Sequence, residues 1–117
     1  MMRYEKKGDV VIDHRTDMMW QSEYIGPMNW DDMMFYLASL ESGWRLPTIY
    51  ELFEIVDLSR TNPASQFPKM PSKRFWSSSS YAESLLLAWV ICFSNGYVYN
   101  GIKTDTYYVR CVRNCNK

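Results

Sequence analysis

Apolar positions between residues 30 and 40 recur at helical spacing. Asn29 lies directly before this segment and can cap a helix, and Asp31 and Asp32 lie in its first turn, where the helix dipole favours acidic side chains. Gly43 follows the segment, as glycine often does at the end of a helix. The pattern predicts a first helix that begins after Asn29 and ends before Gly43.

A second helical segment begins after Thr48. Thr48 and Glu51 have the spacing of a capping box, in which each side chain bonds the backbone N–H of the other residue. We expect this helix to end near residues 58–60. Its predicted buried stripe consists of Ile49, Leu52, Phe53 and Val56.

The segments around these helices have the patterns of short strands and loops. Residues 9–13 and 18–20 are two apolar runs separated by a turn, and Gly26-Pro27 then breaks the chain. Residues 61–72 contain three prolines and few periodic apolar positions, which predicts a long surface loop.

After this loop the apolar period changes from helical to strand-like. Helices in the first half of the chain and a meander of strands in the second half predict the α+β class. The predicted strands cover residues 74–77, 85–93, 97–102 and 107–113.

An Asn-Gly pair at residues 95–96 predicts a β-hairpin between two of these strands. A two-residue turn there pairs Ser94 with Tyr97 and Cys92 with Tyr99. Tyr97 and Tyr99 then lie half-exposed beside Cys92, because side chains alternate strictly between the faces of a strand. The opposite face is expected to be core and carries Trp89, Ile91, Phe93, Val98 and Ile102.

Length and charge narrow the class of protein. The chain has 117 residues, which fits one domain over 1–117, and its 13 basic residues balance its 13 acidic ones. A duplex nucleic acid is not an expected partner, because proteins that bind it carry a basic excess.

No apolar run is long enough to span a membrane, and no membrane interaction is expected. The first residues lack the apolar core of a secretion signal, which predicts a cytoplasmic location for the chain as given and an extracellular one if it is a mature fragment.

Candidate catalytic residues are few. His14 is the single histidine and lies among charged residues, which favours a solvated turn over a catalytic base. Cys111 and Cys115 have a C-x3-C spacing that Cys92 and His14 could complete as a zinc site, but Cys111 falls inside a strand pattern. Free thiols are the preferred interpretation. We therefore expect no enzyme activity, no metal and no cofactor.

Aromatic residues are the unusual part of the composition. Five Trp, nine Tyr and five Phe make up 16% of the chain. Tyr and Trp combine a large contact area with a polar group and are favoured in binding surfaces. The composition therefore favours a domain that recognises another molecule.

A series of motifs runs through nearly the whole chain in a fixed order. It comprises T-D-M-M-W at 16–20, W-R-L-P-T at 44–48, F-W-S-S-S at 75–79, F-S-N-G at 93–96 and Y-V-R-C-V-R at 108–113. This series resembles the DUF1566 family, also called the Lcl C-terminal domain family. The resemblance implies a C-type-lectin-like fold, in which two helices pack on a twisted antiparallel sheet with long loops.

The resemblance also implies a function. Relatives are mostly binding modules at bacterial or phage surfaces, which implies a non-catalytic domain whose aromatic and polar face binds a protein or a glycan. One alternative is an intracellular inhibitor, encoded by a phage or a mobile element, that binds a specific host or defence protein. A second alternative is an enzyme of the formylglycine-generating type, although the sequence offers no paired active-site thiols with a supporting base.

Candidate binding residues combine the predicted tyrosine face with this resemblance. In some relatives the variable positions lie in the hairpin and before the last strand, which corresponds to residues 95–107 here. The sequence does not predict an oligomeric state. The candidate ligand-binding residues are Asn95, Tyr97, Tyr99, Asn100, Lys103, Asp105, Ser79 and Tyr81.

The motif residues themselves are expected to form the scaffold. We expect all five tryptophans in or near the core, with Trp44 buried between the two helices. Arg45 and Arg110 are expected to bind loop carbonyls or carboxylates rather than a ligand.

Overall fold

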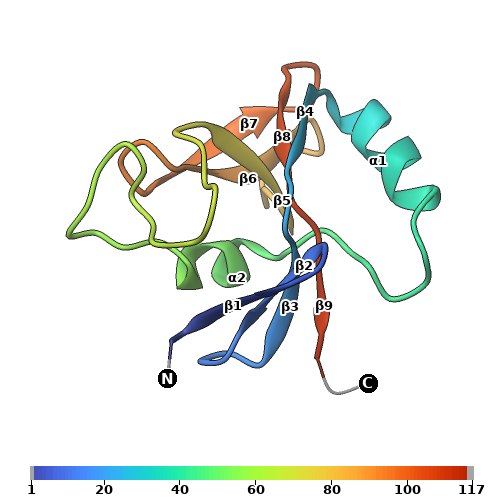
Figure 1. Cartoon of the computed structure of the whole chain (residues 1–117). Helices are drawn as coiled ribbons and strands as arrows, with labels where there is room; N and C mark the ends of the chain where they lie inside the picture. The colour runs from blue at the N-terminus through green and yellow to red at the C-terminus, as the bar shows by residue number, and fades with distance from the viewer. Residues whose placement is uncertain (1, 116–117) are drawn as a thin grey trace.

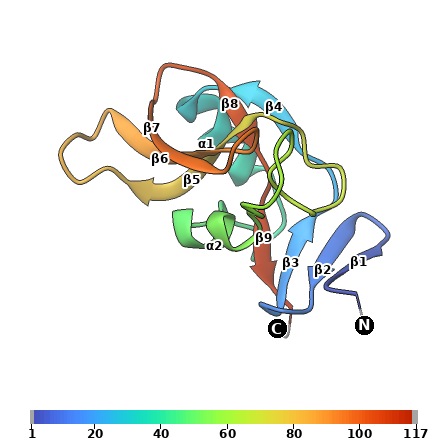
Figure 2. The same cartoon turned by 90° about the vertical axis from the view of Figure 1, so that its left-hand side faces the viewer.

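Two sheets and two helices make up the fold of this chain in a computed structural model that describes residues 2–115 (Figure 1). This arrangement confirms the predicted α+β class. The first and last strands lie at one end of the molecule in both views (Figures 1 and 2). The elements are β1 (Tyr4–Lys7), β2 (Val10–Asp13), β3 (Met18–Gln21), β4 (Ile25–Met28), α1 (Trp30–Ala38), α2 (Ile49–Glu54), β5 (Arg74–Ser80), β6 (Leu87–Cys92), β7 (Tyr97–Ile102), β8 (Tyr107–Val109) and β9 (Val112–Asn114).

The first sheet has the strand order β1-β2-β3-β9 and is antiparallel throughout. Its strands β2 and β3 lie where the apolar runs predicted them, with Val11 opposite Trp20. Trp20 in turn lies opposite Val112 of β9, so the ends of the domain meet in one sheet. Strand β1 was not predicted, because Glu5, Lys6 and Lys7 give it no alternating apolar pattern.

The second sheet has the strand order β4-β8-β5-β6-β7. Only β5 and β8 run parallel, with Phe75 opposite Tyr108. The predicted break at Gly26-Pro27 is wrong, since both residues lie within β4. An edge strand tolerates proline, because its outward N–H has no ladder partner to lose.

The predicted last strand over residues 107–113 is two strands. The chain leaves the second sheet after Val109 and enters the first sheet at Val112. Arg110 lies at this crossing with its side chain 1% exposed, and its guanidinium donates hydrogen bonds to the carbonyls of Pro68 and Lys69, each at 3.2 Å. The expectation that Arg110 holds loop carbonyls is confirmed.

Both predicted helix caps are confirmed. The Asn29 side chain accepts a hydrogen bond from the N–H of Asp32, and Thr48 and Glu51 form the reciprocal capping box of α2. Helix α2 is shorter than predicted and ends at Glu54, where Ile55 turns inward to the core. Neither helix within residues 2–115 is both long and apolar enough to cross a bilayer.

The core consists of two clusters on opposite faces of β6. One cluster includes Ile91 and Phe93, and the other includes Val90. The loop over residues 61–72 was expected on the surface, but Phe67 and Met70 from it are buried in the first cluster. This loop therefore contributes side chains to the hydrophobic core and does not lie only on the surface.

The hairpin between β6 and β7 has a different register from the predicted one. A four-residue turn over residues 93–96 places Cys92 opposite Tyr97, and the Gly96 N–H donates to the Cys92 carbonyl at 2.7 Å. A Cβ on Gly96 would lie 2.8 Å from Val56, so the turn is pressed against the segment that follows α2. The shift is by two residues, which keeps Tyr97 and Tyr99 on one face but changes every cross-strand partner.

Candidate functional site

A groove of about 460 Å³ lies between α2 and the hairpin of β6 and β7. Two aromatic side chains of α2 stand at this groove with large exposed fractions, 80% for Tyr50 and 45% for Phe53. Soluble proteins rarely expose clustered aromatic side chains unless the surface binds something. The lining consists of Ile49, Tyr50, Phe53, Glu54, Trp89 and Val98.

The position of α2 is fixed at its N-terminus. The Glu51 carboxylate accepts two hydrogen bonds from the Arg45 guanidinium, both at 2.7 Å, and a third from the Thr48 N–H. Ser79 of β5 accepts a hydrogen bond from the Ile49 N–H at 2.9 Å, which ties the helix to the second sheet. These bonds turn Leu52 inward and leave the opposite side of the short helix to the groove.

The hairpin side of the groove was expected to be core. Ile91 and Phe93 of this face are fully buried as expected, but Trp89 is half-buried and Val98 and Ile102 are 42% and 50% exposed, so the expectation is wrong for the outer part of the face. The physical reason is the length of α2, whose six residues cover Ile91 but not the outer strand. Tyr81 packs on Trp89 with ring centroids 5.1 Å apart.

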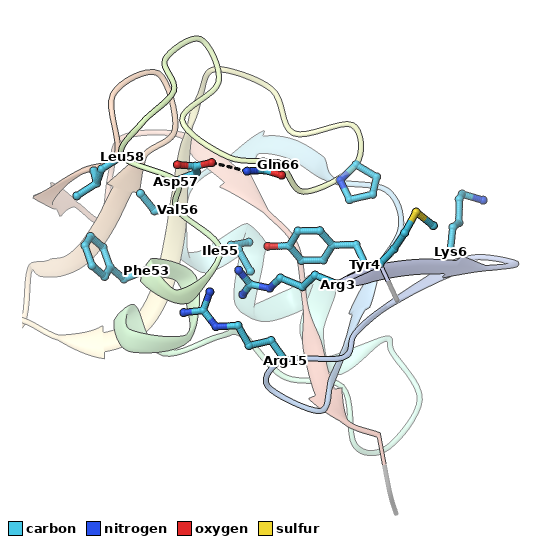
Figure 3. A pocket seen from close by; sticks show the side chains of 12 residues that line it. Arg3, Tyr4, Lys6, Arg15, Phe53, Ile55, Val56, Asp57, Leu58 and Gln66 are labelled. Carbon is cyan, nitrogen blue, oxygen red and sulfur yellow. Dashed lines mark hydrogen bonds between the residues drawn. The ribbon is translucent and has the colours of Figure 1, made fainter.

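A larger hollow of about 970 Å³ lies on the other side of Phe53 (Figure 3). Arg3, just before β1, and Arg15, in the turn between β2 and β3, extend into it toward the end of α2, and Tyr4 points toward Ile55 (Figure 3). Phe53 lines both hollows and therefore separates them.

The polar groups of this larger hollow are bound within the chain. Arg3 donates two hydrogen bonds of 2.9 Å to Asp13 and one of 2.8 Å to the Glu54 carbonyl. Burial raises the pKa of Tyr4 to about 12. Hydrogen bonds from Ser59 and Gln66 lower the pKa of Asp57 to about 2, which keeps it ionised. The hollow is stabilised by these contacts and offers no unpaired acid or base among them.

Residues 9–113 match the Lcl C-terminal domain family. The chain belongs to this family. The resemblance stated from the motifs is thereby confirmed, and the match includes α2 and both strands of the groove. No curated protein and no solved structure is significantly similar to the chain.

Within this Lcl C-terminal domain, Tyr97 and Tyr99 lie on the face of β7 that points away from the groove. Their ring centroids are 6.4 Å apart, and Tyr97 is 59% exposed. The Arg74 guanidinium lies 4.5 Å from the centroid of the Tyr99 ring. Asn95 is a turn residue whose side chain accepts a hydrogen bond from the Tyr97 N–H at 3.0 Å.

The other predicted binding residues lie apart from this tyrosine pair. Asn100 lies opposite Trp89 and so shares the groove face, as does Tyr81. Ser79 accepts a hydrogen bond from the Ile49 N–H at the start of α2. Lys103 lies over the Trp30 ring at 4.5 Å, and Asp105 accepts a hydrogen bond from the Tyr107 hydroxyl at 3.3 Å. The Lcl C-terminal domain thus does not gather the eight predicted residues into one site.

Tyr50 and Phe53 are the groove residues that sequence reasoning missed. The helical pattern assigned Phe53 to the buried stripe and gave Tyr50 no role, whereas Ile55 takes the buried position instead. The available signal was the three-residue spacing of Tyr50 and Phe53, which places two aromatic rings on one side of a helix.

The cysteines of the Lcl C-terminal domain are free thiols. Cys92 was expected to face outward but is 8% exposed, because its strand is covered on both faces. Burial raises the pKa of this thiol, but hydrogen bonding to Ser94 and the charge of Arg74 outweigh it and leave the pKa below its usual value. Among residues 2–115, no three His, Cys, Asp or Glu side chains cluster as metal ligands would.

The tryptophans are only partly in the core. Trp20 and Trp76 are fully buried, whereas Trp44 is half-buried and the expectation that it is buried is wrong. Trp44 packs against the second core cluster on one side, which confirms that it lies near the core, and the Arg113 guanidinium lies 5.3 Å from its ring centroid. Trp30 and Trp89 are also half-buried.

Proposed function

We propose that this Lcl C-terminal domain is a non-catalytic recognition domain with a C-type-lectin-like fold that binds a protein through the groove between α2 and the β6–β7 hairpin. The observation that carries the proposal is the exposure of Tyr50 and Phe53 beside the half-buried Trp89. Aromatic side chains of this kind supply most of the binding energy in protein interfaces.

The chemistry of the groove favours a protein over a glycan. Glu54 is the single ionisable carboxylate in the lining, and its other members are aliphatic or aromatic. A sugar presents many hydroxyl groups that need polar partners when they leave water, whereas an apolar segment of a protein does not. Tyr81 also covers part of the Trp89 ring that a sugar would stack on.

The test is photo-crosslinking from the groove in cells that express the chain. Tyr50 is replaced by a photoreactive phenylalanine, and Phe35 on α1 is the matched control because it is an equally exposed aromatic residue, at 84% against 80%. We expect a discrete protein adduct from position 50 that is absent from position 35 and is lost when Phe53→Asp is added. Equal adducts from both positions, or no protein adduct from position 50, would contradict the proposal.

A further inference from the structure

The two sheets present four edge strands, and three of them carry features that prevent pairing with another strand. Strand β1 has the charged residues Glu5, Lys6 and Lys7, and β9 is only three residues long. Strand β4 contains Pro27, and its pairing with β8 is irregular. Charges, shortness, proline and irregular register are the known protections of sheet edges.

Strand β7 is the exception. Its sequence from Tyr97 to Ile102 contains no charged residue and no proline, and its six residues pair with β6 without a register shift. Within residues 2–115 its other side pairs with no strand. An edge of this kind offers a row of backbone N–H and C=O groups to another strand.

We propose that β7 pairs antiparallel with β7 of a second copy of the chain, around a two-fold axis at Asn100. This inference rests on the backbone edge of β7 and not on the proposed groove function, although Val98 contributes its side chain to the groove. In this register Val98 lies opposite Ile102 of the second copy, Tyr99 lies opposite its Gly101, and the two Asn100 side chains face each other. The pairing would join the two five-stranded sheets into one continuous sheet.

The order of residues in β7 selects a second copy as the occupant. On one side of Asn100 the strand continues with Gly101 and then Ile102, and on the other side with Tyr99 and then Val98. In an antiparallel pair centred on Asn100, the glycine of each copy lies opposite the tyrosine of the other. The two exposed apolar residues, Val98 at 42% and Ile102 at 50%, therefore meet each other across the axis. A register centred on Tyr99 would instead set Val98 against Asn100 and leave Ile102 outside the pair.

Gly101 contributes to this complementarity. A Cβ at this position would lie 2.6 Å from the Tyr107 ring, so the ring covers the glycine directly. Tyr99 of the second copy would then lie beside the Tyr107 ring, in the cross-strand aromatic contact that stabilises glycine in sheets. No charges meet at the axis, since the strand has none.

The test is the oligomeric state of the purified chain in a dilution series, measured by sedimentation or light scattering. Wild type should dimerise, and Asn100→Lys should raise the dimer dissociation constant about tenfold or more, because two ammonium groups then face each other across the axis. Phe35→Lys, at an exposed position of α1, is the matched control and should leave the constant unchanged. Thermal melts establish that each variant is folded.

A charge exchange makes the test specific for this axis. Asn100→Asp alone should also dissociate, and an equimolar mixture of Asn100→Lys and Asn100→Asp should regain the dimer, since only a residue that faces its own copy can be rescued in this way. A monomeric wild type, equal loss in Asn100→Lys and Phe35→Lys, or a mixture that stays monomeric would overturn the proposal. If β7 instead pairs with a strand of another protein, the purified chain will be monomeric, and this result would refute the proposed dimer.

Discussion

The Arg45 guanidinium and the Glu51 carboxylate form a two-pronged ion pair, with both N–O distances at 2.7 Å. The same carboxylate accepts the Thr48 N–H and so caps α2. Burial raises the pKa of Glu51, but the hydrogen bonds from Arg45 and Thr48 outweigh it and lower the pKa. One side chain thus joins the segment between the helices to the start of α2, and the groove depends on that helix.

Replacing Arg45 should therefore destabilise the domain. We expect Arg45→Ala to lower the free energy of unfolding by about 1–2 kcal/mol, a value reduced for the partial exposure of the pair. Arg15→Ala is the control, since Arg15 lies 3.5 Å from Glu54 in an exposed pair and should cost about 0.5 kcal/mol or less. Denaturant titration measures both, and equal losses in the two variants would contradict this role of Arg45.

Asp13 gives the domain a pH dependence on the acid side. Burial raises the pKa of its carboxyl, but the Arg3 guanidinium and the Arg15 N–H donate hydrogen bonds that hold the pKa below its usual value. A group whose pKa is lowered by folding stabilises the protein above its unfolded pKa, and this stabilisation is lost as the pH falls through the lower folded value.

The free energy of unfolding should accordingly fall as the pH drops below about 4. Asp13→Asn should be less stable than wild type at neutral pH and should lose less stability on acidification, because its carboxamide does not titrate. Denaturant titrations at several pH values compare the two chains. Parallel curves for wild type and Asp13→Asn would exclude Asp13 as a source of the pH dependence.

The local signals in the sequence predicted the local structure well. Asn29 and Thr48 mark helix starts because a cap involves only the next three residues. The hairpin register was wrong because the turn is set by Gly96 against Val56, a contact between segments forty residues apart in the chain. Nothing in residues 93–96 alone distinguishes a two-residue from a four-residue turn.

The candidate site depended on long-range packing and was predicted only in part. Alternation placed Trp89 and Val98 on one face correctly, but which face is covered depends on where α2 lies and how long it is. Tyr97 was predicted half-exposed and is exposed. The family resemblance implied a role for Tyr97 in binding, whereas the groove that we propose as the binding site lies on the opposite face of β7.

Arg110 should be the most sensitive polar residue of the scaffold. Its buried guanidinium binds the carbonyls of Pro68 and Lys69, and burial lowers its pKa to about 10, so it stays charged at neutral pH. We expect Arg110→Ala to cost about 3 kcal/mol, because the carbonyls of Pro68 and Lys69 lose their donor and the removal of a fully buried side chain leaves a cavity. Denaturant titration gives the cost, and hydrogen exchange should increase in residues 61–72 first. A loss of unfolding free energy below about 1 kcal/mol would show that the loop over residues 61–72 does not depend on Arg110 for its conformation.

We propose that binding occurs through the groove of Tyr50, Phe53 and Trp89. The most direct test is a titration of the cross-linked partner, once purified, against Phe53→Ala and Tyr97→Ala, two exposed aromatic residues on different surfaces. We expect Phe53→Ala to raise the dissociation constant about tenfold or more and Tyr97→Ala to leave it nearly unchanged. The reverse result, a large loss in Tyr97→Ala and none in Phe53→Ala, would contradict the claim and place binding on the tyrosine face of β7.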